Sequence, residues 1–137
     1  MSEDVPVFGG LHFYVRDIHA AIGFYQLVVL AIDPSAADGG FVNVDLGNGC
    51  SFAFATDDLT RMYDPAFEPP PHLKSAVALQ FDLPSRAAVD EMHARLTGAG
   101  HASHLAPIDA FWGSRYAEVL DPDGNVVGFH SPRAARG

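Results

Sequence analysis

Residues 111–130 read FWGSRYAEVLDPDGNVVGFH, and this stretch carries the strongest structural signals in the chain. Ser114 to Leu120 and Val126 to His130 are short runs in which apolar, β-branched and aromatic residues favour strands. Between them, residues 121–125 (Asp-Pro-Asp-Gly-Asn) combine the residue types that set the backbone of tight turns. The stretch therefore predicts two strands joined by a turn and preceded by a loop that carries Phe111 and Trp112.

The elements upstream of this stretch complete a strand, helix and three-strand unit over about residues 75–132. Their predicted order is a strand from Ala76 to Phe81, a helix capped by Ser85 from about Arg86 to Thr97, and a strand from His101 to Leu105. On this helix Val89, Met92 and Leu96 share one face. Gly98-Ala99-Gly100 ends the helix.

The first half repeats this order over about residues 8–60. Its predicted elements are a strand from Gly10 to Val15, a helix capped by Asp17 from Ile18 to about Leu30, and strands from Phe41 to Leu46 and from Cys50 to Ala55. Prolines exclude a helix or a central strand from residues 64–71, which makes about 61–74 a crossover. Because one such unit cannot bury its own sheet, residues 1–137 predict a single α+β domain of paired modules.

The composition limits the kinds of partner. With 137 residues, 48% hydrophobic and 18% charged, the chain suits a globular domain. A net charge of −9 argues against nucleic acid as a partner. No signal peptide and no membrane-spanning run is recognised, so no membrane partner is expected. The single cysteine, Cys50, favours a reducing compartment, and the protein is expected to be cytoplasmic.

These motifs resemble the vicinal oxygen chelate superfamily of glyoxalases, bleomycin-resistance proteins and extradiol dioxygenases. The resemblance rests on Trp112-Gly113 ahead of residues 121–125, on residues 14–18 (YVRDI) and on Phe24-Tyr25. Residues 61–65 (RMYDP) and the second half look most like the drug-binding resistance proteins of the mitomycin and bleomycin type. The resemblance implies two paired βαβββ modules that form a curved-sheet cleft. It also implies a homodimer, either domain-swapped or side by side.

The metal enzymes of this superfamily take four ligands from four strands. The corresponding positions in this chain are Gly10, Ala53, Ala76 and Gly128. None of these residues has a side chain that can bind a metal. The resemblance therefore implies metal-independent binding of a small planar or aromatic molecule, with no cofactor.

Strand alternation predicts which residues line the cleft, because successive side chains point to opposite faces. The face of the four mapped positions is small or polar, whereas the opposite face is bulky and apolar, as a face packed on helices should be. A sheet face lined by small residues leaves volume for a ligand, although small residues could also let two sheets pack closely. The predicted ligand-binding residues are Trp112, His12, Tyr14, Phe41, Tyr63, Phe67, Gln80, Phe111, Tyr116 and His130.

Several functions remain open on the sequence. The first is sequestration of an aromatic antibiotic or similar planar metabolite, with Trp112 as a stacking wall rather than a plug of the core. The second is a glyoxalase-like or dioxygenase-like enzyme, with a displaced metal site that uses His12 and His130 or with a histidine acid–base group. The third is a subunit whose unused cleft serves assembly alone.

Overall fold

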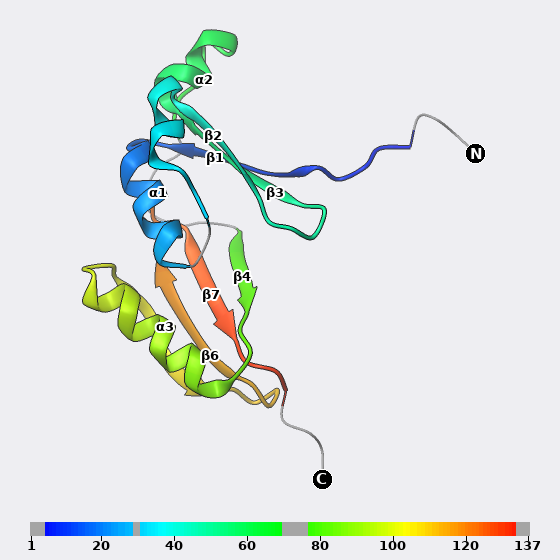
Figure 1. The fold of residues 1–137 in the computed structure, drawn as a ribbon, viewed down its shortest axis with the longest axis vertical. Coiled ribbons are helices and arrows are strands. Elements are labelled where there is room, and N and C mark those ends of the chain that lie inside the picture. The colour runs from blue at the N-terminus through cyan, green and yellow to red at the C-terminus, as the bar shows by residue number, and fades with distance from the viewer. Residues whose placement is uncertain (1–4, 29–30, 70–76, 134–137) are drawn as a thin grey trace. The chain divides into compact units, whose positions relative to one another are not determined.

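The structure, a computed structural model, describes residues 5–28, 31–69 and 77–133 (Figure 1). It contains β1 (Gly10–Val15), α1 (Ile18–Leu27), the 3-10 helix η1 (Pro34–Gly39), β2 (Phe41–Asp45), β3 (Ser51–Thr56), α2 (Asp57–Tyr63), β4 (Ala78–Asp82), α3 (Arg86–Gly98), β5 (Ser103–Asp109), β6 (Arg115–Leu120) and β7 (Val126–His130). The chain divides into two compact units, Met1–Pro69 and Pro70–Gly137. The pairing of these units in one domain stays a prediction.

The first unit is a three-stranded mixed sheet covered by α1. Its strand order is β1-β3-β2, with β1 parallel and β2 antiparallel to β3. The carboxylate of Asp17 caps α1 by accepting hydrogen bonds from the backbone N–H groups of His19 and Ala20, as an N-cap should. On the buried face of α1, the Tyr25 ring lies 5.2 Å from the ring of Phe54 on β3.

Helix α2 was not predicted. It begins after Thr56, whose hydroxyl accepts a hydrogen bond from the Leu59 N–H at 3.1 Å. Asp57 and Asp58 occupy the first turn, where carboxylates interact favourably with the helix dipole. The proline-rich stretch follows this helix, and residues 70–74 of the predicted crossover lie outside the described residues.

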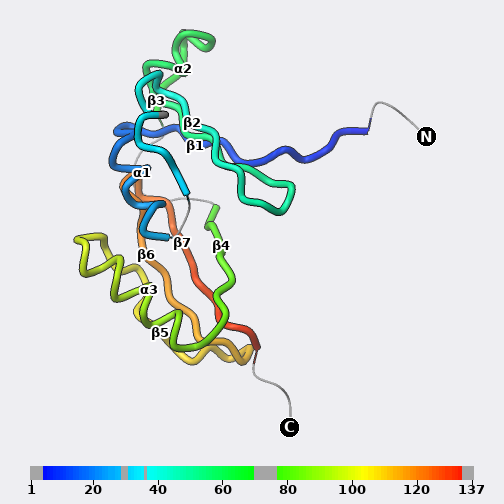
Figure 2. The backbone as a smooth tube through the Cα atoms, in the orientation of Figure 1, coloured from blue at the N-terminus to red at the C-terminus, as the bar shows by residue number. Residues whose placement is uncertain are grey.

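The second unit is a four-stranded mixed sheet in the order β4-β7-β6-β5. The trace runs from β4 through α3 and back through β5 and β6 to β7 (Figure 2). Ser85 caps α3, and the predicted apolar face of Val89, Met92 and Leu96 is buried. Strand β5 lies further along the chain than predicted, at Ser103–Asp109 instead of His101 to Leu105. It is an edge strand with register shifts, which is where a sheet tolerates a proline such as Pro107.

The strand registers confirm the predicted faces of both sheets. In the first unit His12 pairs with Ala53 and Tyr14 with Ala55, and in the second Gln80 pairs with Gly128. Most of the opposite parity is buried, as predicted for a face packed on helices, including Phe54, Leu79, Val127 and Phe129, whereas Leu11 and Val77 near the strand starts are exposed. The α+β class is therefore confirmed. The second unit is βαβββ, and the described part of the first has the order βαββ. Ala76 lies outside the described residues.

Candidate functional site

A chain of hydrogen bonds crosses the second sheet. The Nε2 atom of His130 lies 2.5 Å from Oε1 of Gln80, and Nε2 of Gln80 lies 3.1 Å from the hydroxyl of Tyr116. That hydroxyl donates to Oε2 of Glu118 at 2.7 Å. The register pairs Tyr116 with His130, and both Gln80 and Glu118 with Gly128, so the four side chains share one face.

Gly128 makes room for the centre of this chain. A Cβ atom at this position would lie 2.6 Å from Oε1 of Gln80 and 2.6 Å from the hydroxyl of Tyr116. Both distances are shorter than real Cβ contacts. Gly128 is also one of the four positions mapped to metal ligands. In this protein the space above it is occupied by an amide and a phenol that bind each other.

Three aromatic rings stand beside the hydrogen-bond chain. The centroids of Tyr116 and His130 are 4.6 Å apart, those of Trp112 and Tyr116 are 5.5 Å apart, and those of Trp112 and His130 are 6.3 Å apart. We call Trp112, Tyr116 and His130 the aromatic wall. The loop that carries Trp112 is closed by a 2.9 Å hydrogen bond from the Ala110 N–H to the Ser114 carbonyl. It also needs a glycine at Gly113, where φ is 96°.

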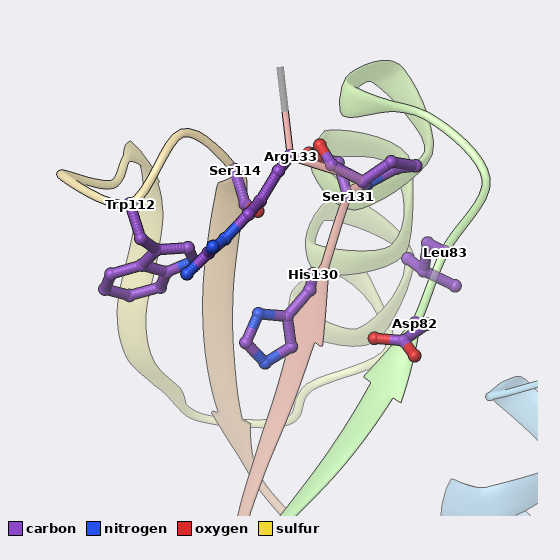
Figure 3. A pocket seen from close by; sticks show the side chains of 8 residues that line it. Asp82, Leu83, Trp112, Ser114, His130, Ser131 and Arg133 are labelled. Atoms are coloured by element: carbon purple, nitrogen blue, oxygen red, sulfur yellow. Dashed lines mark hydrogen bonds between the residues drawn. The ribbon is translucent and has the colours of Figure 1, made fainter. Parts of the chain in front are cut away.

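Trp112 and His130 line a pocket of about 620 Å³, within the usual range for small-molecule sites. The residues that line it are Asp82, Leu83, Trp112, Ser114, His130, Ser131, Pro132 and Arg133. In Figure 3 the His130 ring lies between the side chains of Trp112 and Asp82, and the Arg133 side chain extends toward the indole. The pocket therefore combines a flat aromatic surface with an imidazole and groups of both charges.

The electrostatics of the site centre on Tyr116. Burial raises the pKa of its phenol, and the hydrogen bond to Glu118 raises it further because it favours the protonated form. Tyr116 therefore remains a hydrogen-bond donor at neutral pH. Arg115 does not line the pocket, since its guanidinium binds Asp90 at 2.9 Å and Asp109 at 3.2 Å.

The other predicted ligand residues separate into two groups. In the second unit Phe111 packs against Trp112, with 5.1 Å between centroids, but it is 97% exposed and does not line the pocket. The first unit holds a second aromatic cluster, which consists of His12, Tyr14, Phe41 and Phe67. Tyr63 is exposed on α2. That all ten predicted ligand-binding residues contribute to one site stays a prediction.

The sequence reasoning missed several residues of this site. Asp82, Leu83, Ser114, Ser131, Pro132 and Arg133 line the pocket, and Glu118 ends the hydrogen-bond chain. Strand alternation offered one signal, because Glu118 lies two residues after Tyr116 and so shares its face.

The described positions that correspond to the metal ligands of the superfamily's enzymes carry no side chain able to bind a metal. Within residues 5–28, 31–69 and 77–133, no three His, Cys, Asp or Glu side chains come together as metal ligands would. The mapped positions Gly10, Ala53 and Gly128 offer no donor atom from a side chain. On the second sheet, His104 Nε2 lies 4.0 Å from Glu118 Oε1, and no third ligand joins this pair among the described residues. A tetrahedral or octahedral site needs more ligands than this pair.

The family model of the Glyoxalase/Bleomycin resistance protein/Dioxygenase superfamily matches residues 8–129. The chain belongs to this superfamily. This confirms the resemblance at the level of the superfamily, and the drug-binding subgroup stays a prediction. A comparison with curated proteins finds no match for this superfamily member. In its described part, no helix is both long enough and apolar enough to cross a membrane.

Solved structures of the superfamily share the fold. A glyoxalase/bleomycin resistance protein/dioxygenase family enzyme from Burkholderia phytofirmans PsJN is 25% identical, with a TM-score of 0.76 and coverage of 90% of this chain and 96% of that chain. Lactoylglutathione lyase from Agrobacterium tumefaciens is 20% identical, with a TM-score of 0.64 and coverage of 94% and 96%. A glyoxalase-related enzyme from Fulvimarina pelagi is 17% identical, with a TM-score of 0.74 and coverage of 93% and 89%.

Proposed function

We propose that this superfamily member binds a small planar or aromatic molecule without a metal and sequesters it, as an antibiotic-resistance protein would. The observation that carries the proposal is the aromatic wall of Trp112, Tyr116 and His130 beside a pocket of about 620 Å³. A flat π surface favours stacking on a planar ring system. The nearby polar groups would fix the orientation of such a ligand.

A titration followed by tryptophan emission tests this proposal. Trp112 is the single tryptophan of the chain, so the emission reports on the aromatic wall directly. Untagged protein is treated with EDTA and titrated with mitomycin C, bleomycin and a panel of planar aromatic antibiotics. We expect at least one compound to change the emission saturably and to stabilise the fold against heat. Stabilisation by none of them would favour the third hypothesis, in which the subunit serves assembly alone.

We also propose that the protein acts in the cytoplasm as a homodimer. The exposed aromatic residues of the first unit support association, since Tyr14 and Phe41 on its sheet face are each 44% exposed. Phe8 on the N-terminal side of β1 is 69% exposed. Covering such side chains with a second copy would remove apolar surface from water. The single cysteine of the chain supports a reducing compartment.

A second candidate function is acid–base catalysis by His130 on a bound substrate. The hydrogen-bond chain favours it, because a histidine oriented through Nε2 presents its other ring nitrogen as a base. One structural neighbour is a lactoylglutathione lyase, which makes lactoylglutathione a suitable probe. Consumption of this probe by the wild-type protein, with loss of that consumption in His130→Asn, would favour the enzyme. A probe that stays intact while aromatic compounds bind would favour sequestration.

A further inference from the structure

The direction of the hydrogen-bond chain follows from the charge at its end. The Glu118 carboxylate can only accept hydrogen bonds, so the Tyr116 hydroxyl donates its single proton to Oε2 in the 2.7 Å hydrogen bond. The phenol oxygen must then accept at its 3.1 Å contact, which makes the Gln80 amide nitrogen the donor. The amide oxygen of Gln80 therefore faces His130.

This direction fixes the state of His130. An amide oxygen has no proton to give, so the imidazole donates to it through Nε2 across the 2.5 Å contact. In a neutral imidazole the other nitrogen, Nδ1, then carries a lone pair. Of the described residues none forms a hydrogen bond with Nδ1, and the ring lines the pocket (Figure 3).

The reversed chain is inconsistent with an ionised glutamate. If the Gln80 amide were turned over, its oxygen would need the Tyr116 proton, and two unprotonated oxygens would meet at 2.7 Å between Tyr116 and Glu118. The side chain of Glu118 keeps 19% of its surface exposed, which leaves water access to the charge. Gly128 completes the arrangement, because any side chain there would displace the amide and the phenol.

We propose that Glu118, Tyr116 and Gln80 are positioning residues that hold His130 as a hydrogen-bond acceptor toward the pocket. The ligand class that fits is a planar aromatic molecule with an N–H or O–H donor in the plane of its ring. Such a molecule can stack on Trp112 while its edge donates to Nδ1 of His130. This assignment rests on the proposed binding function, and the direction of the chain can be tested without any ligand.

The ligand-free test is ¹⁵N NMR of the imidazole in labelled protein at about pH 8.5, where imidazoles are neutral. We expect the wild-type His130 proton on Nε2 alone. In Glu118→Gln the new amide can donate as well as accept, so the chain loses its direction and both tautomers should appear. Tyr116→Phe, which breaks the chain at its centre, should have the same effect.

Glu91→Gln is the matched control, because Glu91 is exposed on α3 and lies outside the chain. It removes one negative charge and should leave the His130 signals unchanged. A wild-type proton on Nδ1 would overturn the assignment. An unchanged His130 tautomer in both Glu118→Gln and Tyr116→Phe would also overturn it, since a folded protein would then hold His130 by other means.

The ligand test compares matched probes by calorimetry. Norharmane presents a ring N–H, and 9-methylnorharmane replaces that proton with a methyl group on the same planar ring. Further N–H and N–methyl pairs of planar heteroaromatic compounds extend the test. We expect methylation to weaken binding to the wild type about fivefold to tenfold, the equivalent of one neutral hydrogen bond. In Glu118→Gln this difference should shrink, because His130 then accepts in only part of the molecules.

The outcomes separate the two proposals. Equal binding of both members of the pairs would overturn the ligand class and leave the proposed function standing. If no pair binds although a compound of the antibiotic panel does, the ligand class alone is overturned. If neither the pairs nor any compound of that panel binds, the proposed function is overturned and the ligand class with it.

Discussion

Replacing Gly128 with alanine would insert a methyl group into the centre of the hydrogen-bond chain. The new Cβ would lie 2.6 Å from both Oε1 of Gln80 and the hydroxyl of Tyr116, whereas ordinary contact begins at 3.4 Å. Each group would have to give way by roughly 0.8 Å, the difference between these two distances. Gln80 can rotate away, but the hydroxyl of Tyr116 sits at the end of a rigid ring.

The substitution should lower the stability of the fold and also disturb the site. Loss of the Gln80–Tyr116 and Gln80–His130 hydrogen bonds costs about 1–3 kcal/mol at typical values. Alanine recovers about 0.5–1 kcal/mol relative to glycine in the interior of a strand. Pressing the methyl group against the buried Tyr116 ring adds about 1–3 kcal/mol of overpacking. The free energy of unfolding of Gly128→Ala should therefore fall by about 1–5 kcal/mol. Its His130 should lose the single tautomer and its binding of N–H probes should weaken.

Urea unfolding and the His130 NMR spectrum measure these two effects separately. Gly23→Ala is a suitable control, because a Cβ there meets nothing within 4 Å and α1 lies in the other unit. It should raise stability by up to about 1 kcal/mol and leave binding unchanged. A Gly128→Ala protein with wild-type His130 signals and wild-type affinity would refute the reasoning about the site.

Four further predictions concern the wall, the pH response, a turn and assembly. Trp112→Ala should weaken ligand binding by about 1–3 kcal/mol; a loss of about 3–5 kcal/mol in stability with normal binding would identify a core plug instead. Because the folded-state pKa of Tyr116 is raised, its stabilising contribution is full below the ordinary value of 10.0 and is lost as pH rises through the folded-state pKa. Between about pH 8 and pH 11, the free energy of unfolding measured with urea should therefore fall less in Tyr116→Phe than in the wild type. The same pH dependence in both proteins would contradict this expectation. Asp121→Ala removes an acceptor from the N–H groups of Asp123 and Asn125, so stability should drop by about 2–3 kcal/mol with tautomer and binding intact; a drop below about 0.5 kcal/mol would argue against the turn. Sedimentation at micromolar concentration should give a dimer, and a monomer alone would exclude the proposed assembly.

Much of the fold could be predicted because its signals are local. The bounds of β1 and β7 match the predicted strands, and the buried face of α3 is the one its apolar spacing indicated. Helix α2 escaped prediction because it is only seven residues long and begins at a threonine that also ends a strand. The prediction placed β5 too early in the chain because a proline normally argues against a strand. Pro107 is tolerated in β5 because this strand lies at the edge of the sheet.

The site was less predictable because it depends on which strands are neighbours. Alternation placed Gln80 and His130 on the predicted face, but only the order β4-β7-β6 shows that Gln80 reaches across Gly128 on the middle strand to the Tyr116 hydroxyl. No spacing along one strand reveals that neighbour relation. For the same reason the sequence did not indicate that Glu118 ends the hydrogen-bond chain. Gly128 was recognised as a position without a metal ligand, and the structure adds what occupies the space above it.

The most direct test of the central claim is a titration of metal-free protein that follows the emission of Trp112. The protein is purified without a tag, treated with EDTA and shown by elemental analysis to hold no stoichiometric divalent ion. It is then titrated with the planar aromatic panel, with and without added Zn²⁺, Mn²⁺ or Ni²⁺. Metal-independent binding predicts a saturable change in emission with the same dissociation constant in the presence and absence of each ion. Binding that appears only after one of these ions is added would contradict it.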